Sequence, residues 1–341
     1  MNKITYKDSG VDTEKSANMI SDIKANIEST HIKGVMSKIG GFAGLFDLKA
    51  TSLKDPILVT GTDGVGTKVK LAIDYNKHDG IGFDLMAMCV NDILVQGAKP
   101  LFFLDYFACG KLDVNVSKQV INSVANACKE AGCALVGGET AEMPGTYEKN
   151  KFDIAGFAVG VVGKNKILNK EKIRNNDLIL AIPSSGLHSN GFSLVRYLIN
   201  KKKINIKKNR FLKTELLRPT KIYVKEVLKL IDKNLINGCA NITGGGLADN
   251  IKRVMPDNFV AEINLDKIRT SRIFKWLNKN GISEKEMLKT FNCGVGFCLI
   301  INPKKYEKVR QYFTKDFKPY VIGKISKGGT KVKLNGSINW I

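Results

Sequence analysis

Residues 58–68 (Leu-Val-Thr-Gly-Thr-Asp-Gly-Val-Gly-Thr-Lys) combine glycines, hydroxyls, a lysine and one carboxylate as a phosphate-binding turn would. Gly61 and Gly66 have the spacing of a Walker loop, but threonine precedes Lys68 and Asp63 lies inside the turn. A carboxylate beside phosphates is repulsive unless a divalent cation such as Mg²⁺ lies between them. The segment therefore predicts a nucleotide site in which Asp63 helps to hold Mg²⁺. A glycine-rich hairpin between two strands is the alternative.

Two further carboxylates and one histidine suit the same chemistry. Asp92 interrupts an apolar helical pattern, where burial would require a cation or another partner. Glu139 follows two glycines at the end of a short apolar run. His188 stands among small residues at an expected helix start, where anions bind and where an imidazole can transfer protons; a structural histidine is the alternative. With three histidines and no His/Cys cluster, the set favours Mg²⁺ and phosphate over a transition metal.

The composition limits the class of protein. The chain has 341 residues, 43% of them hydrophobic, and a formal net charge of +22. The basic residues are mostly lysines without interleaved aromatics, as in the run 201–208, so a basic nucleic-acid-binding protein is the less favoured alternative. No apolar run reaches the roughly 18 residues of a membrane helix, and the N-terminus has no export signal. Scattered cysteines without a CxxC pair indicate a reducing compartment, so we expect a cytoplasmic enzyme.

The elements that must position these residues alternate between helix and strand. Asp12 is a suitable N-cap for a helix over 13–30. The other elements expected in the first half are strand 57–60, helix 81–97, strand 101–107 with Asp105 in its middle, helix 116–131, strand 134–136 and strand 154–162. A polar stretch over 164–176 marks the boundary between an N-terminal domain, 1–168, and a C-terminal domain, 169–341.

The second half shows the same alternation. We expect strand 178–182, helix 192–199, a helix opened by Arg218-Pro219, a helix opened by Gly244-Gly245-Gly246, strand 297–301, helix 303–313 and strand 320–325. Both halves therefore indicate layered α/β or α+β domains. The tail 331–341 carries no motif, and we assign it no role.

These motifs identify a family. The chain resembles the phosphoribosylformylglycinamidine cyclo-ligases, or aminoimidazole ribonucleotide synthetases, of purine biosynthesis. The likeness runs from Tyr6 to about Gly323 and includes Gly40-Gly41-Phe42, the segment 61–68, residues 88–92, 102–106, 137–144, 184–196, 243–246 and 291–296. The resemblance implies an α/β fold with two parts. Its N-terminal ATP-binding and dimerisation domain has a mixed sheet that forms a barrel across a dimer interface. A C-terminal α/β sandwich domain follows, with the active site in a cleft between the two.

The resemblance also implies the reaction, which is ATP-dependent closure of formylglycinamidine ribonucleotide to 5-aminoimidazole ribonucleotide, with ADP and phosphate released. ATP phosphorylates the formyl amide oxygen. The implied ligands are ATP, Mg²⁺ and this small-molecule substrate, bound by a homodimer without nucleic acid or membrane partners.

The implied roles divide the site residues into four groups. Those for ATP are Gly40, Gly41, Phe42, Gly64, Gly66, Thr67, Lys68, Asp92, Gly244 and Gly245. Those for Mg²⁺ are Asp63 and Asp92. Those for the substrate are Glu139, Ser189 and Asn190, and those for catalysis are His188, Asp63 and Glu139, with His188 the first choice for proton transfer.

Other enzymes of the wider superfamily are the competing interpretations. Selenophosphate synthetase, thiamine-phosphate kinase and a hydrogenase maturation factor share the ATP chemistry and the fold. A selenophosphate synthetase would commonly carry a reactive cysteine near its glycine-rich N-terminal segment. The earliest cysteine here is Cys89, which disfavours that alternative.

Overall fold

The computed structural model describes residues 5–329 and 331–341, which form two compact units. The first unit comprises the chain up to Ile93 together with Lys99–Lys164. The second comprises Leu94–Ala98 and Asn165–Ile341. The long continuous part of the second unit begins at Asn165, a residue of the polar stretch 164–176.

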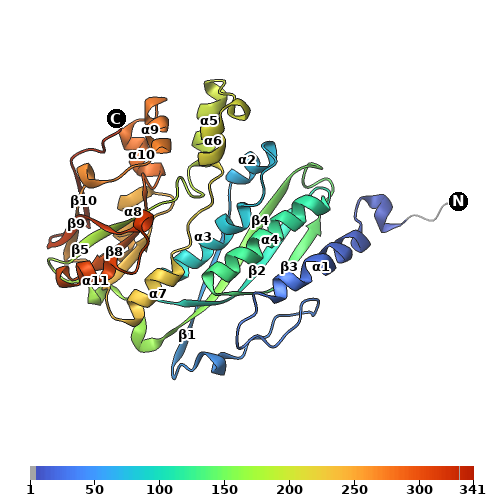
Figure 1. Ribbon diagram of the computed structural model, residues 1–341, viewed down its shortest axis with the longest axis horizontal. Coiled ribbons are helices and arrows are strands. Elements are labelled where there is room, and N and C mark those ends of the chain that lie inside the picture. Colours follow the sequence, from blue (N-terminus) through green and yellow to red (C-terminus); the bar gives the residue numbers. More distant parts are fainter. Residues whose placement is uncertain (1–4, 330) are drawn as a thin grey trace. The chain divides into compact units, whose positions relative to one another are not determined.

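The first unit is built on a four-stranded mixed sheet (Figure 1). Its strand order is β1-β4-β2-β3, with β1/β4 and β4/β2 antiparallel and β2/β3 parallel. The strands are β1 Pro56–Gly64, β2 Lys99–Cys109, β3 Ala134–Glu142 and β4 Phe152–Gly163, and the helices are α1 Thr13–Glu28, α2 Lys68–Asp74, α3 Ile81–Val95 and α4 Val114–Ala131. The mixed sheet with flanking helices confirms the predicted fold class.

Two caps delimit helices of this sheet, and the one at Asp12 was expected from the sequence. Asp12 accepts a hydrogen bond from the Lys15 backbone N–H at 3.0 Å and begins α1. Gly132 has φ +69° and ends α4, a conformation that glycine adopts at low cost. Because α1 and α4 pack on each other and on β3, these caps also set the position of the strand that carries Glu139.

The two faces of the first sheet differ in burial. Side chains alternate between faces along a strand, and the helices cover one face. On the other face Leu58 is 51% exposed, Phe157 44% and Tyr106 36%. The structure holds one copy of the chain, so the implied barrel across a dimer interface is not shown.

The second unit contains a six-stranded sheet of order β10-β7-β9-β5-β8-β6. Only the β10/β7 pair is parallel. The strands are β5 Leu178–Pro183, β6 Gly238–Asn241, β7 Phe259–Asn264, β8 Val295–Ile301, β9 Tyr320–Lys327 and β10 Val332–Asn335. The helices are α5 Phe192–Lys201, α6 Arg210–Leu216, α7 Val224–Asp232, α8 Gly246–Val254, α9 Arg272–Lys279, α10 Glu284–Thr290 and α11 Tyr306–Arg310.

Several expectations about local structure were wrong. Asp63 lies in β1 and not in a turn, because the strand continues through Gly64 while paired with β4. The helix expected from Arg218 begins at Val224, and α6 lies in a stretch for which no element was expected. The tail has a structural role, since β10 pairs with β7.

No helix of the described residues is long and apolar enough to cross a membrane.

Candidate active site

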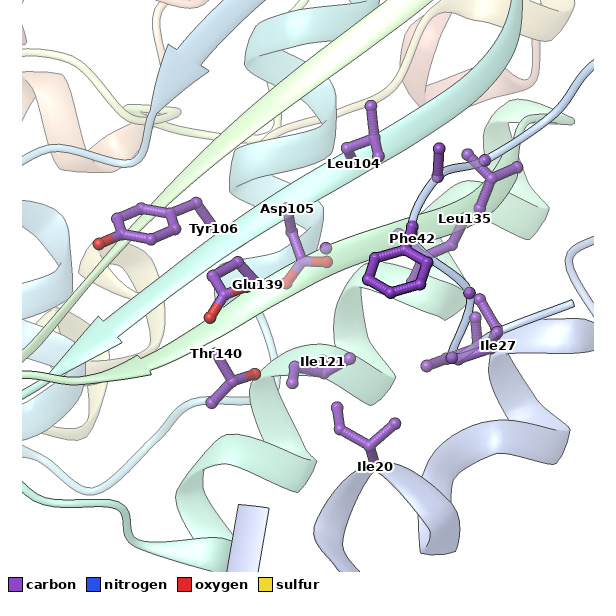
Figure 2. Close-up of a pocket in the computed structure, with 18 of the residues that line it drawn as sticks. Ile20, Ile27, Phe42, Leu104, Asp105, Tyr106, Ile121, Leu135, Glu139 and Thr140 are labelled. Atoms are coloured by element: carbon purple, nitrogen blue, oxygen red, sulfur yellow. The ribbon is translucent and has the colours of Figure 1, made fainter. Parts of the chain in front are cut away.

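A cavity of about 620 Å³ opens beside the edge strand β3 of the first unit (Figure 2). Its walls come from α1, from the loop 38–44, from β2 and β3, and from Ile121 of α4 and Phe157 of β4. The volume lies within the usual range of small-molecule pockets. Gly40, Gly41, Phe42 and Glu139, all predicted site residues, line this one pocket.

The loop 38–44, which we call the flap, has an anchored base and an open tip. At its base Val35 forms an isolated β-bridge with Phe46, and the Met36 N–H donates to the Leu45 carbonyl at 2.9 Å. The Phe46 ring lies 5.6 Å from that of Phe102 on β2. Phe42 at the tip is fully exposed, although it lines the pocket. The flap is therefore anchored at its base, and its tip contributes to the lining of the pocket.

Two carboxyl groups line the pocket from neighbouring strands. Figure 2 shows Glu139 on β3 and Asp105 on β2. Asp105 is 7% exposed, and its burial raises the pKa of its carboxyl to about 7. A Cβ atom at position 138 would collide with the Asp105 carboxyl, so Gly138 makes room for it. Asp105 was not among the predicted site residues, although its carboxylate in the middle of an apolar strand is a signal that could have found it.

Asp63 lies on the helix-covered face of the sheet, in one cross-strand row with Asp105. The register pairs Asp63 with Gly156 of β4, and Gly156 with Asp105 of β2. Asp63 Oδ1 accepts a hydrogen bond from the Gly64 N–H at 2.8 Å. Burial raises the pKa of Asp63, and the nearby charge of Asp92 raises it further. Two carboxylates that repel each other fit a divalent cation, which would relieve the repulsion.

The structure brings only some of the predicted carboxylates together. Asp92 is exposed on α3 and not buried as the apolar pattern suggested, whereas its neighbour Asn91 is buried. Glu139 pairs with Tyr106 and therefore points to the face opposite Asp63. Among the described residues there is no group of three or more His, Cys, Asp or Glu side chains that could hold a metal ion. Asp63 and Asp92 thus form a pair, and Glu139 belongs to the pocket.

The turn after β1 positions Thr67 and Lys68. Gly66 has φ +69°, which glycine tolerates, and Thr67 precedes α2. The Lys68 side chain is 1% exposed, and its Nζ lies 2.8 Å from the Asp84 carboxylate of α3. The ammonium predicted to contact phosphate is therefore engaged in a buried ion pair, which the sequence did not indicate.

In the second unit, His188 lies in a constrained turn. It is 3% exposed and has φ +61°, which is uncommon for a residue other than glycine. The Ser185 backbone N–H donates to His188 Nε2 at 3.2 Å. A nitrogen that accepts from an N–H carries no proton, so this contact selects the tautomer with the proton on Nδ1.

The residues after His188 approach the glycine-rich loop before α8. Ser189 Oγ lies 3.0 Å from Thr220 Oγ1, and Asn190 Oδ1 lies against Gly244. Asn250 Nδ2 donates to the Gly246 carbonyl at 2.7 Å and to the Gly244 carbonyl at 3.2 Å. The glycine loop is therefore held by a side chain of its own helix, next to the predicted substrate residues.

Comparisons with known proteins agree over nearly the whole chain. The AIR synthase related protein N-terminal domain matches residues 45–162, and the corresponding C-terminal domain matches residues 174–335. A phosphoribosylformylglycinamidine cyclo-ligase of Finegoldia magna is 46% identical over 338 residues, which are 97% of this chain and 99% of that protein. The trifunctional purine biosynthetic protein adenosine-3 of Gallus gallus is 48% identical over 97% of this chain, which spans 34% of that longer protein.

Solved structures share the fold at low identity. A hydrogenase maturation protein HypE in complex with ATP gives a TM-score of 0.67 at 19% identity, covering 92% of this chain and 87% of that one. A thiamine-monophosphate kinase of Stenotrophomonas maltophilia gives 0.65 at 17% identity, covering 94% and 96%. At these low identities the two structures show that this chain shares their fold over most of its length.

Proposed function

The chain belongs to the AIR synthase related family, and on this premise we propose how its residues carry out ATP-dependent ring closure. The reaction converts formylglycinamidine ribonucleotide to 5-aminoimidazole ribonucleotide in purine biosynthesis and releases ADP and phosphate. The match to a cyclo-ligase over almost the full length of both proteins is the observation that carries this assignment.

The chemistry requires activation of a poor leaving group. The formyl amide oxygen attacks the γ-phosphorus of ATP, the bond to the β-phosphate oxygen breaks, and ADP leaves. A nitrogen of the substrate then attacks the formyl carbon, and phosphate departs with the former amide oxygen. Such a transfer depends on positioning and electrostatics more than on a protein nucleophile.

We assign the nucleotide to the pocket beside β3. Gly40, Gly41 and Phe42 of the flap line it and would cover a bound nucleotide. Asp105, whose burial keeps its carboxyl largely protonated below about pH 7, can donate a hydrogen bond there. Glu139 on the same strand pair would accept hydrogen bonds from substrate or nucleotide hydroxyls and amines.

Asp63 and Asp92 are the proposed ligands of Mg²⁺. Burial raises the pKa of Asp63 and the charge of Asp92 raises it further, and a cation between the two carboxylates would relieve both effects, which supports this assignment. When bound, Mg²⁺ supplies charge neutralisation for the transferred phosphoryl group. Gly64 ends β1 directly after Asp63, Gly66 and Thr67 belong to the turn that follows, and all three would lie near the phosphates.

Lys68 has a different proposed role from the one expected. Its ion pair with Asp84 ties the start of α2 to α3, the helix that carries Asp92. Breaking a buried ion pair by removing one partner is strongly destabilising. We therefore assign Lys68 to positioning of the turn that holds Gly66 and Thr67, and direct phosphate contact is not required of it.

His188 is the proposed group for proton transfer. In this structure Nε2 accepts from the Ser185 N–H, so the neutral ring presents Nδ1–H as a hydrogen-bond donor, and His188 would take up a proton only where substrate displaces the Ser185 contact at Nε2. Ser189 and Asn190 follow in the same turn and would contact the substrate. Gly244 and Gly245 precede α8, where a helix N-terminus favours a phosphate group.

We also propose a cytoplasmic homodimer. Leu58, Tyr106 and Phe157 form an exposed apolar area on one face of the first sheet, and a second copy would cover it. All seven cysteines are free and buried, which suits a reducing compartment.

The reaction is tested by measuring ADP release from purified protein with Mg²⁺ and ATP, with and without formylglycinamidine ribonucleotide. We expect ADP and 5-aminoimidazole ribonucleotide in equal amounts, and only when the substrate is present. Substrate-independent ADP release, or none from folded protein, would refute the assignment.

A further inference from the structure

A second, smaller pocket of the first unit has no part in the reaction described above. It has a volume of about 180 Å³ and shares no lining residue with the pocket beside β3. We call it the basic pocket. It is lined by Ile73, Asn76, His78, Phe107, Cys109, Lys111, Asp113, Val116, Ser117, Lys149, Asn150, Lys151 and Phe152.

The charges around the basic pocket favour an anion. Lys111, Lys149 and Lys151 line it, and none of their ammonium groups forms an ion pair within the described part of the chain. The 18-residue helix α4 begins here, and its N-terminal end carries positive partial charge. Asp113 is the one acidic lining residue, and its carboxylate accepts from the N–H groups of Asn115 and Val116.

The buried histidine gives the pocket chemical specificity. His78 is 3% exposed and packs on Phe152, which stacks on Phe107 with ring centroids 5.0 Å apart. His78 Nε2 lies 3.2 Å from Asn76 Oδ1, which can only accept, so Nε2 carries a proton. His78 Nδ1 is buried without a hydrogen-bond partner. A buried acceptor without a donor costs free energy that a suitable ligand would recover.

We propose that the basic pocket binds a small phosphate-bearing anion, held by Lys111, Lys149 and Lys151 and by a hydrogen bond to His78 Nδ1. A hydrogen phosphate or singly protonated phosphomonoester supplies both the negative charge for the lysines and the P–OH donor for Nδ1. Sulfate carries similar charge without a proton, so it satisfies only the lysines. The proposal does not depend on the assigned reaction, because no residue of that assignment lines this pocket.

The protonation states of the groups at the basic pocket determine the pH at which binding should be measured. Burial lowers the pKa of His78, while the nearby charges of Asp113 and Asp79 oppose that change. The other titratable groups at the pocket are the three lysines and Cys109, whose burial raises its thiol pKa to about 11. At pH 8 we therefore expect a neutral imidazole, and a ligand proton is then needed at Nδ1.

Histidine NMR provides a site-specific readout, because the chain has only three histidines. Protein labelled with ¹⁵N-histidine would be titrated at pH 8 with inorganic phosphate and, separately, with sulfate. The His78→Asn variant assigns the His78 signal. We expect a saturable shift of that signal with phosphate and at least tenfold weaker binding of sulfate.

Matched variants separate the basic pocket from other phosphate sites. Lys149→Ala/Lys151→Ala should weaken the phosphate-dependent shift of His78 about tenfold. The control Lys207→Ala/Lys208→Ala removes the same charge from an exposed stretch of the second unit and should leave it unchanged. A His78 signal that does not move, equal weakening by both double variants, or equal affinity for phosphate and sulfate would each overturn the proposal. At pH 6, where about half of a phosphomonoester keeps its second proton, tighter binding of the phosphomonoester than of inorganic phosphate would identify an organic phosphate as the source of the anion.

Discussion

The sheets of the two units are built on opposite plans. In the second unit, every residue of β8 is buried and β5 beside it is almost wholly buried. In the first unit, β1 is mostly exposed and the interior strand β2 carries Asp105. One sheet is an apolar core whose predicted site residues lie in loops, namely residues 188–190 and 244–245. The other sheet holds carboxylates within its strands and leaves one face uncovered. The strands that form this sheet therefore also carry predicted site residues.

The largest effect is expected from the carboxylates of the first sheet. Asp63→Asn should lower kcat on the order of 10²- to 10³-fold, because it removes a proposed carboxylate ligand of the cation that would neutralise the phosphoryl group. Turnover measured across a Mg²⁺ titration checks this, with the exposed Asp74→Asn as the control. An Asp63→Asn variant with unchanged kcat and Mg²⁺ dependence would place the metal elsewhere.

Asp105 should make the stability of the first unit depend on pH. The unfolded chain releases this proton near the ordinary pKa of 3.8, whereas the folded chain holds it until about 7. Stability is therefore lost as pH rises from about 4 to about 7 and is level above that. Asp105→Asn removes this loss, which amounts to about 4 kcal/mol at most.

The measurement is the difference in Tm between Asp105→Asn and the parent protein at several pH values. Between pH 4.5 and 7.5, the Tm of Asp105→Asn should rise relative to the Tm of the parent protein. Asp153→Asn, an exposed position on β4, is the control and should give a small, level difference. A level difference for Asp105→Asn as well would contradict the prediction.

The apolar sheet should be the more sensitive of the two to a cavity. Leu299 on β8 is fully buried, and Leu299→Ala should cost about 3 kcal/mol through lost burial and the void that remains. Leu58→Ala on the open face of β1 should cost well under 1 kcal/mol in a single copy of the chain. Urea unfolding of both variants at low protein concentration measures the two losses in free energy of unfolding. Equal losses would contradict the prediction.

The smallest effect concerns the uncovered face. Leu58→Asp should weaken self-association at least tenfold, or about 1.4 kcal/mol, because a charge would be buried against the second copy. Leu58→Met keeps an apolar side chain and serves as the control. Sedimentation at graded concentrations distinguishes them; two variants with the same dissociation constant would show that this face is not the interface.

The sequence predicted the elements that depend on neighbours along the chain. The cap at Asp12 and the stop at Gly132 are local hydrogen-bonding and backbone effects, and both are present. The predicted length of β1 was too short, because the strand is extended by pairing with β4. This partner lies about a hundred residues away in the sequence, and Asp63 lies opposite its Gly156. The strand β10 was missed because four residues without a motif become a strand only through pairing with β7.

Tertiary contacts also explain why some predicted site residues differ from their positions in the structure. Lys68 follows a glycine-rich stretch in the sequence, and only the folded chain brings Asp84 to it. Asp92 shares an apolar helix with Asn91, yet one is exposed and the other buried, because helix packing decides which side faces the sheet. Gly40, Gly41 and Phe42, by contrast, were singled out by the family resemblance as nucleotide residues, and they do line a pocket.

The strand β1 forms an edge of the first sheet over nine residues. Its first half, Pro-Ile-Leu-Val-Thr, carries no charge that would discourage a foreign strand from pairing with it. Until a proper partner covers it, this edge is a template for misassembly. The yield of refolding should therefore fall as chain concentration rises, and a lysine placed outward on this edge would protect the monomer from aggregation.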